Sequence, residues 1–140
     1  MSAKKILVVD DNVVVVKTIQ MQLIKAGFEV SIAMDGSEAI GIVRKEKPDL
    51  IVLDISFPPD VGGGGGIPWN GFLIIQWLRR IDEAKTTPII IVTGEDPAKH
   101  KAEAMKLGAV AFFTKPVRYP ELIEAVNQAL ANPPSTPTAG

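Results

Sequence analysis

The stretch Pro48-Asp49-Leu50-Ile51-Val52-Leu53-Asp54 decides the fold of this chain. Leu50 to Leu53 form an unbroken apolar run of strand length, which is typical of a strand buried on both faces in a parallel sheet. The run ends on a carboxylate, Asp54. Ligands of open parallel sheets bind just beyond the carboxyl ends of the strands. The stretch therefore predicts a central strand with a functional acid at its end.

Two further apolar runs end on polar side chains in the same way. Ile6-Leu7-Val8-Val9 is followed by Asp10 and Asp11, and Ile89-Ile90-Ile91-Val92 is followed by Thr93. Parallel strands need long crossover connections, usually helices, and the segments between these runs are long enough to supply them. If the three strands are neighbours, three acids and one hydroxyl meet at one edge of the sheet.

Length and composition narrow the class of protein. The chain has 140 residues, 46% of them hydrophobic, which suits one domain with a buried core. A net charge of −1 with scattered lysines and arginines does not favour direct binding to nucleic acid or to an anionic membrane. The absence of cysteine excludes disulfides and zinc–sulfur sites. No signal peptide or membrane span is predicted, so we expect a cytoplasmic protein.

The remaining pattern predicts five strand–helix units and an α/β fold with helices on both sides of the sheet. The expected strands are 6–9, 28–33, 50–53, 87–92 and 110–113. The expected helices begin after Asn12, after Asp35 or Ser37, after Asn70, at Ala98 and at Pro120. Residues 132–140, rich in proline, serine and threonine, are expected to be a disordered tail.

The first helix has an apolar pattern that is ambiguous on its outer side. Helical spacing places Val13, Val16 and Leu23 on the inner face. Val14 and Val15 then fall on the outer face, where a solvated helix would be polar. They are either a docking surface or an ordinary scatter of exposed apolar residues.

The acids, Thr93 and Lys115 together suit phosphoryl chemistry. Carboxylates held close together repel one another, and a hard divalent cation such as Mg²⁺ relieves that repulsion through oxygen ligands. Lys115, at the end of the fifth expected strand, adds a positive charge, and Thr93 adds a hydroxyl donor. A phosphoryl group needs these partners for its spread negative charge. An Asp-Asp pair alone is more often a turn that caps a helix than a functional site.

Four motifs, each at the end of an expected strand, carry a resemblance to a known family. KILVVDD, DLIVLD, IIIVTGE and FFTKP together resemble the receiver domain of bacterial two-component response regulators, of the chemotaxis type. The resemblance covers about residues 4 to 131. It implies a flavodoxin-like, doubly wound sheet of five parallel strands in the order 2-1-3-4-5, with five helices.

The resemblance also implies a role for each acid. Asp54 would be the phosphoacceptor. Asp11, Asp54 and the backbone carbonyl of Ser56 would bind Mg²⁺ directly, with Mn²⁺ as an alternative, and Asp10 would act through metal-bound water. A second aspartate at the position of Ser56 would instead suggest a metal-dependent phosphohydrolase, so the serine argues against that class.

Further residues would bind the phosphoryl group and respond to it. Thr93 and Lys115 would hold the phosphoryl oxygens, and Phe112 stands where the family has its rotating aromatic residue, more commonly tyrosine. The Lys115–Pro116 peptide bond would be cis, which only a bond before proline adopts at low cost. A receiver-like module that is never phosphorylated is a third hypothesis, and the complete set of acids, hydroxyl and lysine argues against it.

The function implied is a phosphorylation-dependent switch and not a turnover enzyme. It would accept a phosphoryl group from a histidine kinase or phosphotransfer protein, shift the face made by its fourth helix, fifth strand and fifth helix, and dephosphorylate itself. It would be a stand-alone receiver or the N-terminal receiver of a larger regulator, acting on a protein target. It would be a monomer or a phosphorylation-dependent homodimer.

An insert interrupts the expected receiver domain, residues 1–131. It spans about residues 59–69 and contains Gly62 to Gly66, which have no preferred conformation. We expect a hinged flap beside the phosphorylation site, with Trp69 folding toward Leu73 and Trp77 on the next helix. A partner site at these aromatic residues is the alternative, and partly buried covers are the plainest interpretation.

Overall fold

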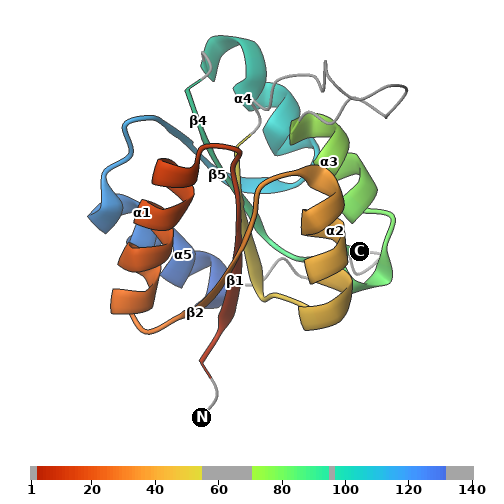
Figure 1. The fold of residues 1–140 in the computed structure, drawn as a ribbon. Coiled ribbons are helices and arrows are strands. Elements are labelled where there is room, and N and C mark those ends of the chain that lie inside the picture. Colours follow the sequence, from red (N-terminus) through yellow and green to blue (C-terminus); the bar gives the residue numbers. More distant parts are fainter. Residues whose placement is uncertain (1–2, 55–70, 95–96, 132–140) are drawn as a thin grey trace.

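A computed structural model describes residues 3–54, 71–94 and 97–131. Over these residues the chain forms a five-stranded sheet in the order β2-β1-β3-β4-β5, with every neighbouring pair parallel (Figure 1). The strands are β1 (Lys5–Val9), β2 (Glu29–Ala33), β3 (Leu50–Leu53), β4 (Ile89–Thr93) and β5 (Ala109–Thr114). The predicted fold class and strand order are confirmed.

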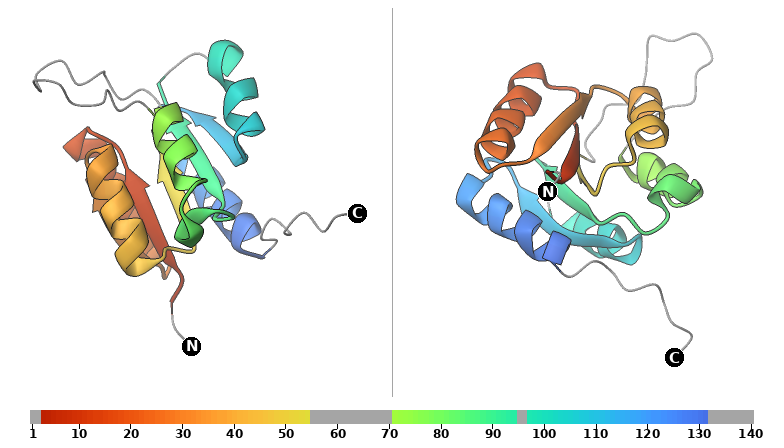
Figure 2. Two further views of the ribbon diagram at one scale, coloured as in Figure 1. Left: turned by 90° about the vertical axis from the view of Figure 1, so that its right-hand side faces the viewer. Right: turned by 90° about the horizontal axis from the view of Figure 1, so that it is seen from below.

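Helices cover both faces of the sheet. They are α1 (Val13–Lys25), α2 (Gly36–Glu46), α3 (Gly71–Leu78), the short 3-10 helix η1 (Asp82–Ala84), α4 (Pro97–Lys106) and α5 (Tyr119–Ala131). In the two further views, α1 and α5 lie on one face, and α2, α3 and α4 lie on the other (Figure 2). The architecture is therefore three layers, with one apolar core on each side of the sheet.

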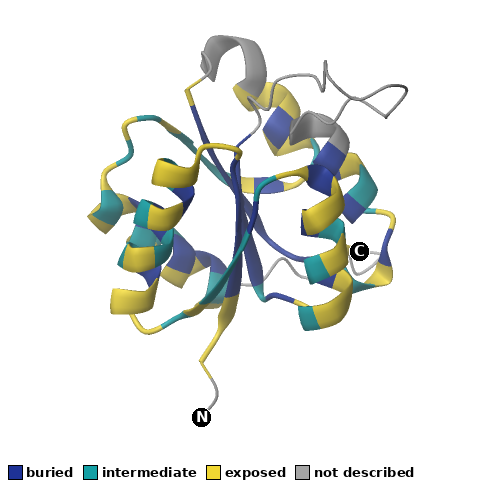
Figure 3. Ribbon diagram, viewed as in Figure 1, coloured by how far each residue is buried: buried dark blue, intermediate teal, exposed yellow. Residues whose placement is uncertain are grey.

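The central strand divides its side chains between the two cores. Leu50 and Val52 pack with α1 and α5, whereas Ile51 and Leu53 pack with α2, α3 and α4. All four are buried, as are nearly all residues of the neighbouring strands β1 and β4, which Figure 3 draws dark blue. Burial of each such side chain contributes roughly 1.5–3 kcal/mol. The unbroken apolar run thus reflects a strand with no face toward water.

The buried face of α1 is rotated relative to the prediction. Val16 and Leu23 are buried as expected, but Val13 is 56% exposed. The prediction for Val13 was wrong, since this residue, the first of α1, packs in neither core. Val15, expected on the outer face, is partly buried against the core that includes Ile19, four residues on. Val14 is 69% exposed, as predicted.

Side-chain caps define where α1 and α2 begin. The Asn12 side chain accepts hydrogen bonds from the first turn of α1, as the sequence predicted. Asp35 caps α2 by accepting from the Glu38 backbone N–H, and the Glu38 carboxylate accepts in return from the Met34 N–H. This pair resembles a capping box, except that the Glu38 carboxylate binds the N–H of the residue before the cap and not that of the cap itself.

The sequence did not indicate the role of Arg79, just after α3. Its guanidinium donates to four carbonyl oxygens: Thr87 (2.7 Å), Ala84 (3.0 Å), Leu107 (3.3 Å) and Gly108 (3.3 Å). Burial lowers the pKa of the guanidinium. Arg79 therefore joins η1 and the segment before β4 to the turn between α4 and β5.

Several sequence-based expectations lie outside the described residues. They concern Ser56, the insert with Trp69, the Asn70 cap and the tail at 132–140. Trp77 is half-buried on α3, and the side chain of Leu73 is also outside the description. Among the helices of the described ranges, none has both the length and the apolar character needed to cross a membrane.

Candidate functional site

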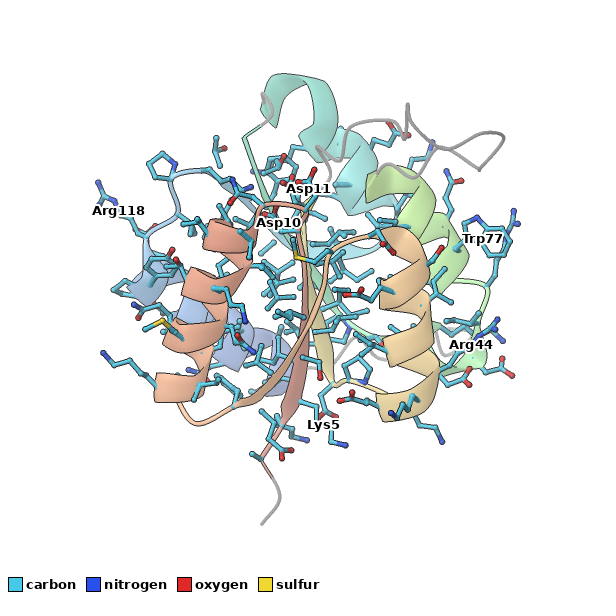
Figure 4. The ribbon with its side chains drawn as sticks, in the orientation of Figure 1. Lys5, Asp10, Asp11, Arg44, Trp77 and Arg118 are labelled. Atoms are coloured by element: carbon cyan, nitrogen blue, oxygen red, sulfur yellow. The ribbon has the colours of Figure 1, made fainter. Side chains whose placement is uncertain are left out.

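The predicted site residues meet at the carboxyl edge of the sheet. Asp10 and Asp11 follow β1, Asp54 follows β3, Thr93 ends β4, and Lys115 follows β5. Because the strands are parallel, their carboxyl ends share one edge, and Figure 4 shows Asp10 and Asp11 there, where the chain turns from β1 into α1. Strand order alone thus brings together residues separated by up to about a hundred positions in the sequence.

Backbone hydrogen bonds continue the ladder of the sheet one residue past the strands and hold three of these residues in place. The backbone N–H of Asp10 donates to the Ala33 carbonyl (3.2 Å), that of Asp54 to the Val9 carbonyl (3.0 Å) and that of Lys115 to the Thr93 carbonyl (2.8 Å). The side chains therefore project from backbone that is hydrogen-bonded in the same way as the sheet.

The three acids form one cluster, as predicted. Asp10 and Asp54 are buried, with 2% and 4% of their surface exposed, and Asp11 is exposed. Each can place a carboxylate oxygen within 4.8 Å of the other two. Thr93 is fully buried at the same edge. Asp11 is thus the acid that faces solvent.

Lys115 lies between the two buried acids. Its Nζ is 2.8 Å from Asp10 Oδ2 and 2.9 Å from Asp54 Oδ2. The sequence predicted a positive charge here, but not that one ammonium group would pair with both carboxylates. A single cation therefore offsets part of the repulsion between two buried negative charges.

The environment shifts two pKa values in the site. Burial is the largest influence on Asp10 and raises the pKa of its carboxyl, and the charge of Asp54 adds to this. The hydrogen bonds from Lys115 and Asn12 act in the opposite direction without reversing the shift. Burial alone would lower the pKa of Lys115, but its bonds to Asp10 and Asp54 and their negative charges raise it. Lys115 is therefore held as an ammonium ion.

The donor set fits a hard divalent cation. Mg²⁺ takes six oxygen ligands at roughly 2.0–2.1 Å, usually one or two carboxylates together with waters and phosphate oxygens. Ligands of one such ion lie no more than about 4 Å apart across it, comparable with the spread of the carboxylate oxygens of Asp10, Asp11 and Asp54. Asp11, which is exposed, leaves an approach for an ion from solvent. The cluster can therefore hold Mg²⁺.

Two other predicted residues lie on or just after β5. Phe112 is half-buried and packs against the core beneath α2, α3 and α4. The Lys115–Pro116 peptide bond is cis, as the resemblance implies.

Comparison with known proteins gives the family. The family model for the response regulator receiver domain matches residues 6–127. This chain is a response regulator receiver domain. Protein PilH of Pseudomonas aeruginosa is 33% identical over 127 residues, which cover 91% of this chain and 98% of PilH.

Solved structures agree with this assignment. The chemotaxis response regulator CheY4 of Vibrio cholerae is 30% identical, with a TM-score of 0.77 over 91% of this chain and 98% of its own. The receiver domain of sensor histidine kinase PA1611 from P. aeruginosa PAO1, described with a magnesium ion in its active-site cleft, has a TM-score of 0.78. It is 23% identical over 93% of this chain and 99% of its own, a likeness that supports the fold alone.

Membership in this family establishes the general activity. Receiver domains are phosphorylation-dependent signalling switches of two-component systems and not turnover enzymes. They bind Mg²⁺ at an acidic pocket and interact with histidine kinases or phosphotransfer proteins. The predicted family is confirmed, and the acidic cluster of this receiver domain lies where such a pocket is needed.

Proposed function

We propose that this receiver domain accepts a phosphoryl group on Asp54 from a histidine kinase or phosphotransfer protein and later loses it to water. One observation carries the proposal: Asp54 is buried at the end of the central strand, with one carboxylate oxygen 2.9 Å from Lys115 Nζ and two further acids beside it. A buried carboxylate with a cation at its oxygen is oriented to act as a nucleophile.

The residues of the pocket divide the work of the transfer. Asp11, Asp54 and the Ser56 carbonyl would hold Mg²⁺, or Mn²⁺ in its place, and Asp10 would bind a metal-bound water. The bound ion supplies positive charge that offsets the acids and the phosphoryl oxygens. An oxygen of Asp54 forms the new bond to phosphorus as the bond from phosphorus to the donor nitrogen breaks. The donor imidazole leaves and Lys115 and Thr93 bind the phosphoryl oxygens.

The proposed switch runs through Thr93 and Phe112. A phosphoryl group on Asp54 brings new acceptor oxygens to the sheet edge, toward which the Thr93 hydroxyl moves. The space it leaves admits the ring of Phe112, and the face made by α4, β5 and α5 changes. A shift from 1:99 to 99:1 needs about 5.5 kcal/mol of differential binding, so we expect a partial shift without a partner. NMR spectra with and without beryllofluoride test this, and changes confined to the pocket would contradict it.

The phosphodonor is proposed to dock on α1. Val13 and Val14 are 56% and 69% exposed in its first turn, two and three residues from Asp11. Val14→Lys should slow transfer from the kinase and spare labelling by acetyl phosphate, which needs no docking surface. Equal slowing with both donors would indicate a damaged pocket.

Residues 1–131 would form the whole receiver domain, which acts in the cytoplasm on a protein target.

The central test is Asp54→Asn, which keeps the shape of the side chain and removes the nucleophile. We expect no labelling by acetyl phosphate or by a phosphorylated kinase, with the fold intact by circular dichroism. The control is Asp82→Asn, since the Asp82 side chain is 91% exposed in η1, away from the pocket. Labelling of Asp54→Asn at the wild-type rate would refute the assignment.

A further inference from the structure

Asn12 makes hydrogen bonds in two directions. Its side-chain Oδ1 accepts from the backbone N–H groups of Val14 (2.9 Å) and Val15 (3.2 Å), which caps α1. Its own backbone N–H donates to Asp10 Oδ1 at 2.9 Å. A single exposed residue thus joins the first turn of α1 to a buried acid of the pocket.

Asp10 is held by one donor on each carboxylate oxygen. Oδ1 accepts from the Asn12 N–H, and Oδ2 accepts from Lys115 Nζ at 2.8 Å. Two donors on opposite oxygens fix the plane of the carboxylate, whereas one donor leaves it free to rotate about the remaining bond. The direction of the Asn12 N–H therefore decides how Asp10 presents its oxygens to the pocket.

That direction depends on the Asn12 side chain. Asn12 has extended backbone angles, φ −92° and ψ 112°, while the next residue already begins the helix. The two bonds from the helix to Oδ1 stabilise this conformation at the cap position. An alanine here would keep the N–H group but lose the bonds that hold it in line with Asp10.

We propose that Asn12 is a positioning residue for phosphoryl acceptance. By capping α1, its side chain fixes the backbone N–H that orients Asp10, and through Asp10 it fixes the acidic pocket around Asp54. This inference rests on the proposed function, because it concerns the rate at which Asp54 is labelled. The residue acts through Asp10 and does not touch the reacting atoms.

A second helix cap offers a matched control. Asp35 caps α2 as Asn12 caps α1, with its Oδ1 2.8 Å from the Glu38 N–H. Among the residues that the structure describes, no hydrogen bond joins Asp35 to an acid of the pocket. Asp35→Ala and Asn12→Ala should therefore cost similar stability, and only Asn12→Ala should disturb Asp10.

The experiment compares wild type, Asn12→Ala, Asn12→Ser and Asp35→Ala in acetyl phosphate labelling at saturating Mg²⁺. Asn12→Ala should be labelled roughly tenfold more slowly, the lower end of the effect of residues that orient a metal site. Serine, which also caps helices, should restore the rate to near wild type. The residue-12 amide should lose its downfield proton shift in the alanine variant and keep it in the serine variant.

Each result tests either the proposed function or the role of Asn12. If wild type itself is not labelled at Asp54, the proposed function fails first. If wild type is labelled and Asn12→Ala matches its rate, Asn12 does not position the pocket. If Asp35→Ala is slowed equally, the slower labelling of Asn12→Ala comes from lost stability alone. If Asn12→Ser does not restore the rate, loss of the helix cap is not the cause of the slower labelling.

Discussion

Lys115 and Arg79 are two partly buried cations with opposite kinds of partner. Lys115, at the carboxyl edge of the sheet, pairs with the carboxylates of Asp10 and Asp54. Arg79, near the residues that enter β4 and β5, bonds to four backbone carbonyls. The pKa of Lys115 is raised because the attraction of both carboxylates outweighs burial, and that of Arg79 is lowered by burial.

The difference separates an exchangeable contact from a structural one. Carboxylates accept any suitable cation, so Mg²⁺ or a phosphoryl group can rearrange the partners of Lys115. The four carbonyls that Arg79 binds lie where the chain enters β4 and β5, at the opposite end of the strands from the acidic cluster, and buried carbonyls need a donor. We therefore expect Lys115 to respond to ligands and Arg79 to hold the same bonds throughout.

The largest loss of stability is expected for Arg79→Ala. Four carbonyls lose a charged donor, and a hydrogen bond to a charged group contributes about 1.5–3 kcal/mol. Since two of the bonds are long, at 3.3 Å, we expect a total loss of about 3 kcal/mol. Urea denaturation should give the same loss in EDTA and in Mg²⁺.

The neighbouring Arg80→Ala is the control for this prediction. Arg80 is exposed and adjacent in sequence, so its loss should change stability by no more than about 0.5 kcal/mol. A loss for Arg79→Ala that Mg²⁺ reverses would place Arg79 with Lys115 among the ligand-responsive contacts.

Lys115→Met should have the next largest effect, and Mg²⁺ should reduce it. Removing one partner of a fully buried ion pair costs about 3–5 kcal/mol. The Lys115 side chain is 24% exposed, so water enters and we expect about 2 kcal/mol in EDTA. Mg²⁺ supplies the missing charge and should restore most of the loss.

Lys85→Met is the matched control for the lysine. Lys85 pairs with Asp82 at 3.5 Å on the surface, with 64% of its side chain exposed, and such pairs contribute little. Mg²⁺ should leave its stability unchanged. If Lys115→Met loses the same stability in EDTA and in Mg²⁺, the lysine is structural and the comparison fails.

The sequence was sufficient for the fold and for the residues at the sheet edge. Apolar runs without alternation predicted doubly covered parallel strands, and parallel strands place their carboxyl ends together. That β1 and β3 are neighbours, which brings the polar residues after them together, came from the strand order that the resemblance to receiver domains implies.

The sequence was not sufficient where a side chain's direction or its neighbours decide the outcome. Arg79 and Arg80 are adjacent residues of the same type, so the sequence does not show which of them points inward. Arg79 does so because the carbonyl groups that it binds lie at or after the end of η1 and after α4. The exposure of Val13 depends on how the first turn of α1 lies relative to the core, which helical spacing alone does not determine. The bond from Lys115 to Asp10 likewise depends on the distance between β1 and β5, which are not neighbouring strands.

A smaller effect is expected for Gly108→Ala, which sharpens the account of Arg79. Gly108 has φ +100°, and a Cβ there would lie 2.9 Å from Arg79 Nη2. Gly27 has nearly the same φ, +101°, with nothing within 4 Å. Each alanine should lose about 1–2 kcal/mol of stability because of the left-handed backbone. Any additional loss for Gly108→Ala over Gly27→Ala therefore measures how far the new Cβ disturbs the Arg79 guanidinium. Equal losses in urea denaturation would show that Arg79 moves aside at no cost.

The smallest effect is a pH trend for Asp10→Asn. The pKa of Asp10 is raised by burial in the folded state, so the folded chain keeps this proton when the unfolded chain has lost it. The contribution of Asp10 to the stability of the wild type therefore falls as pH rises from about 4 through the folded pKa. Asparagine does not ionise, so in EDTA the variant should gain on the wild type across this window, by less than the Lys115→Met loss. Mg²⁺ favours the ionised carboxylate of Asp10, so in Mg²⁺ the wild type should instead gain stability relative to Asp10→Asn as pH rises. A constant difference from pH 4 to 7 in EDTA would mean that Lys115 fully offsets the burial of Asp10.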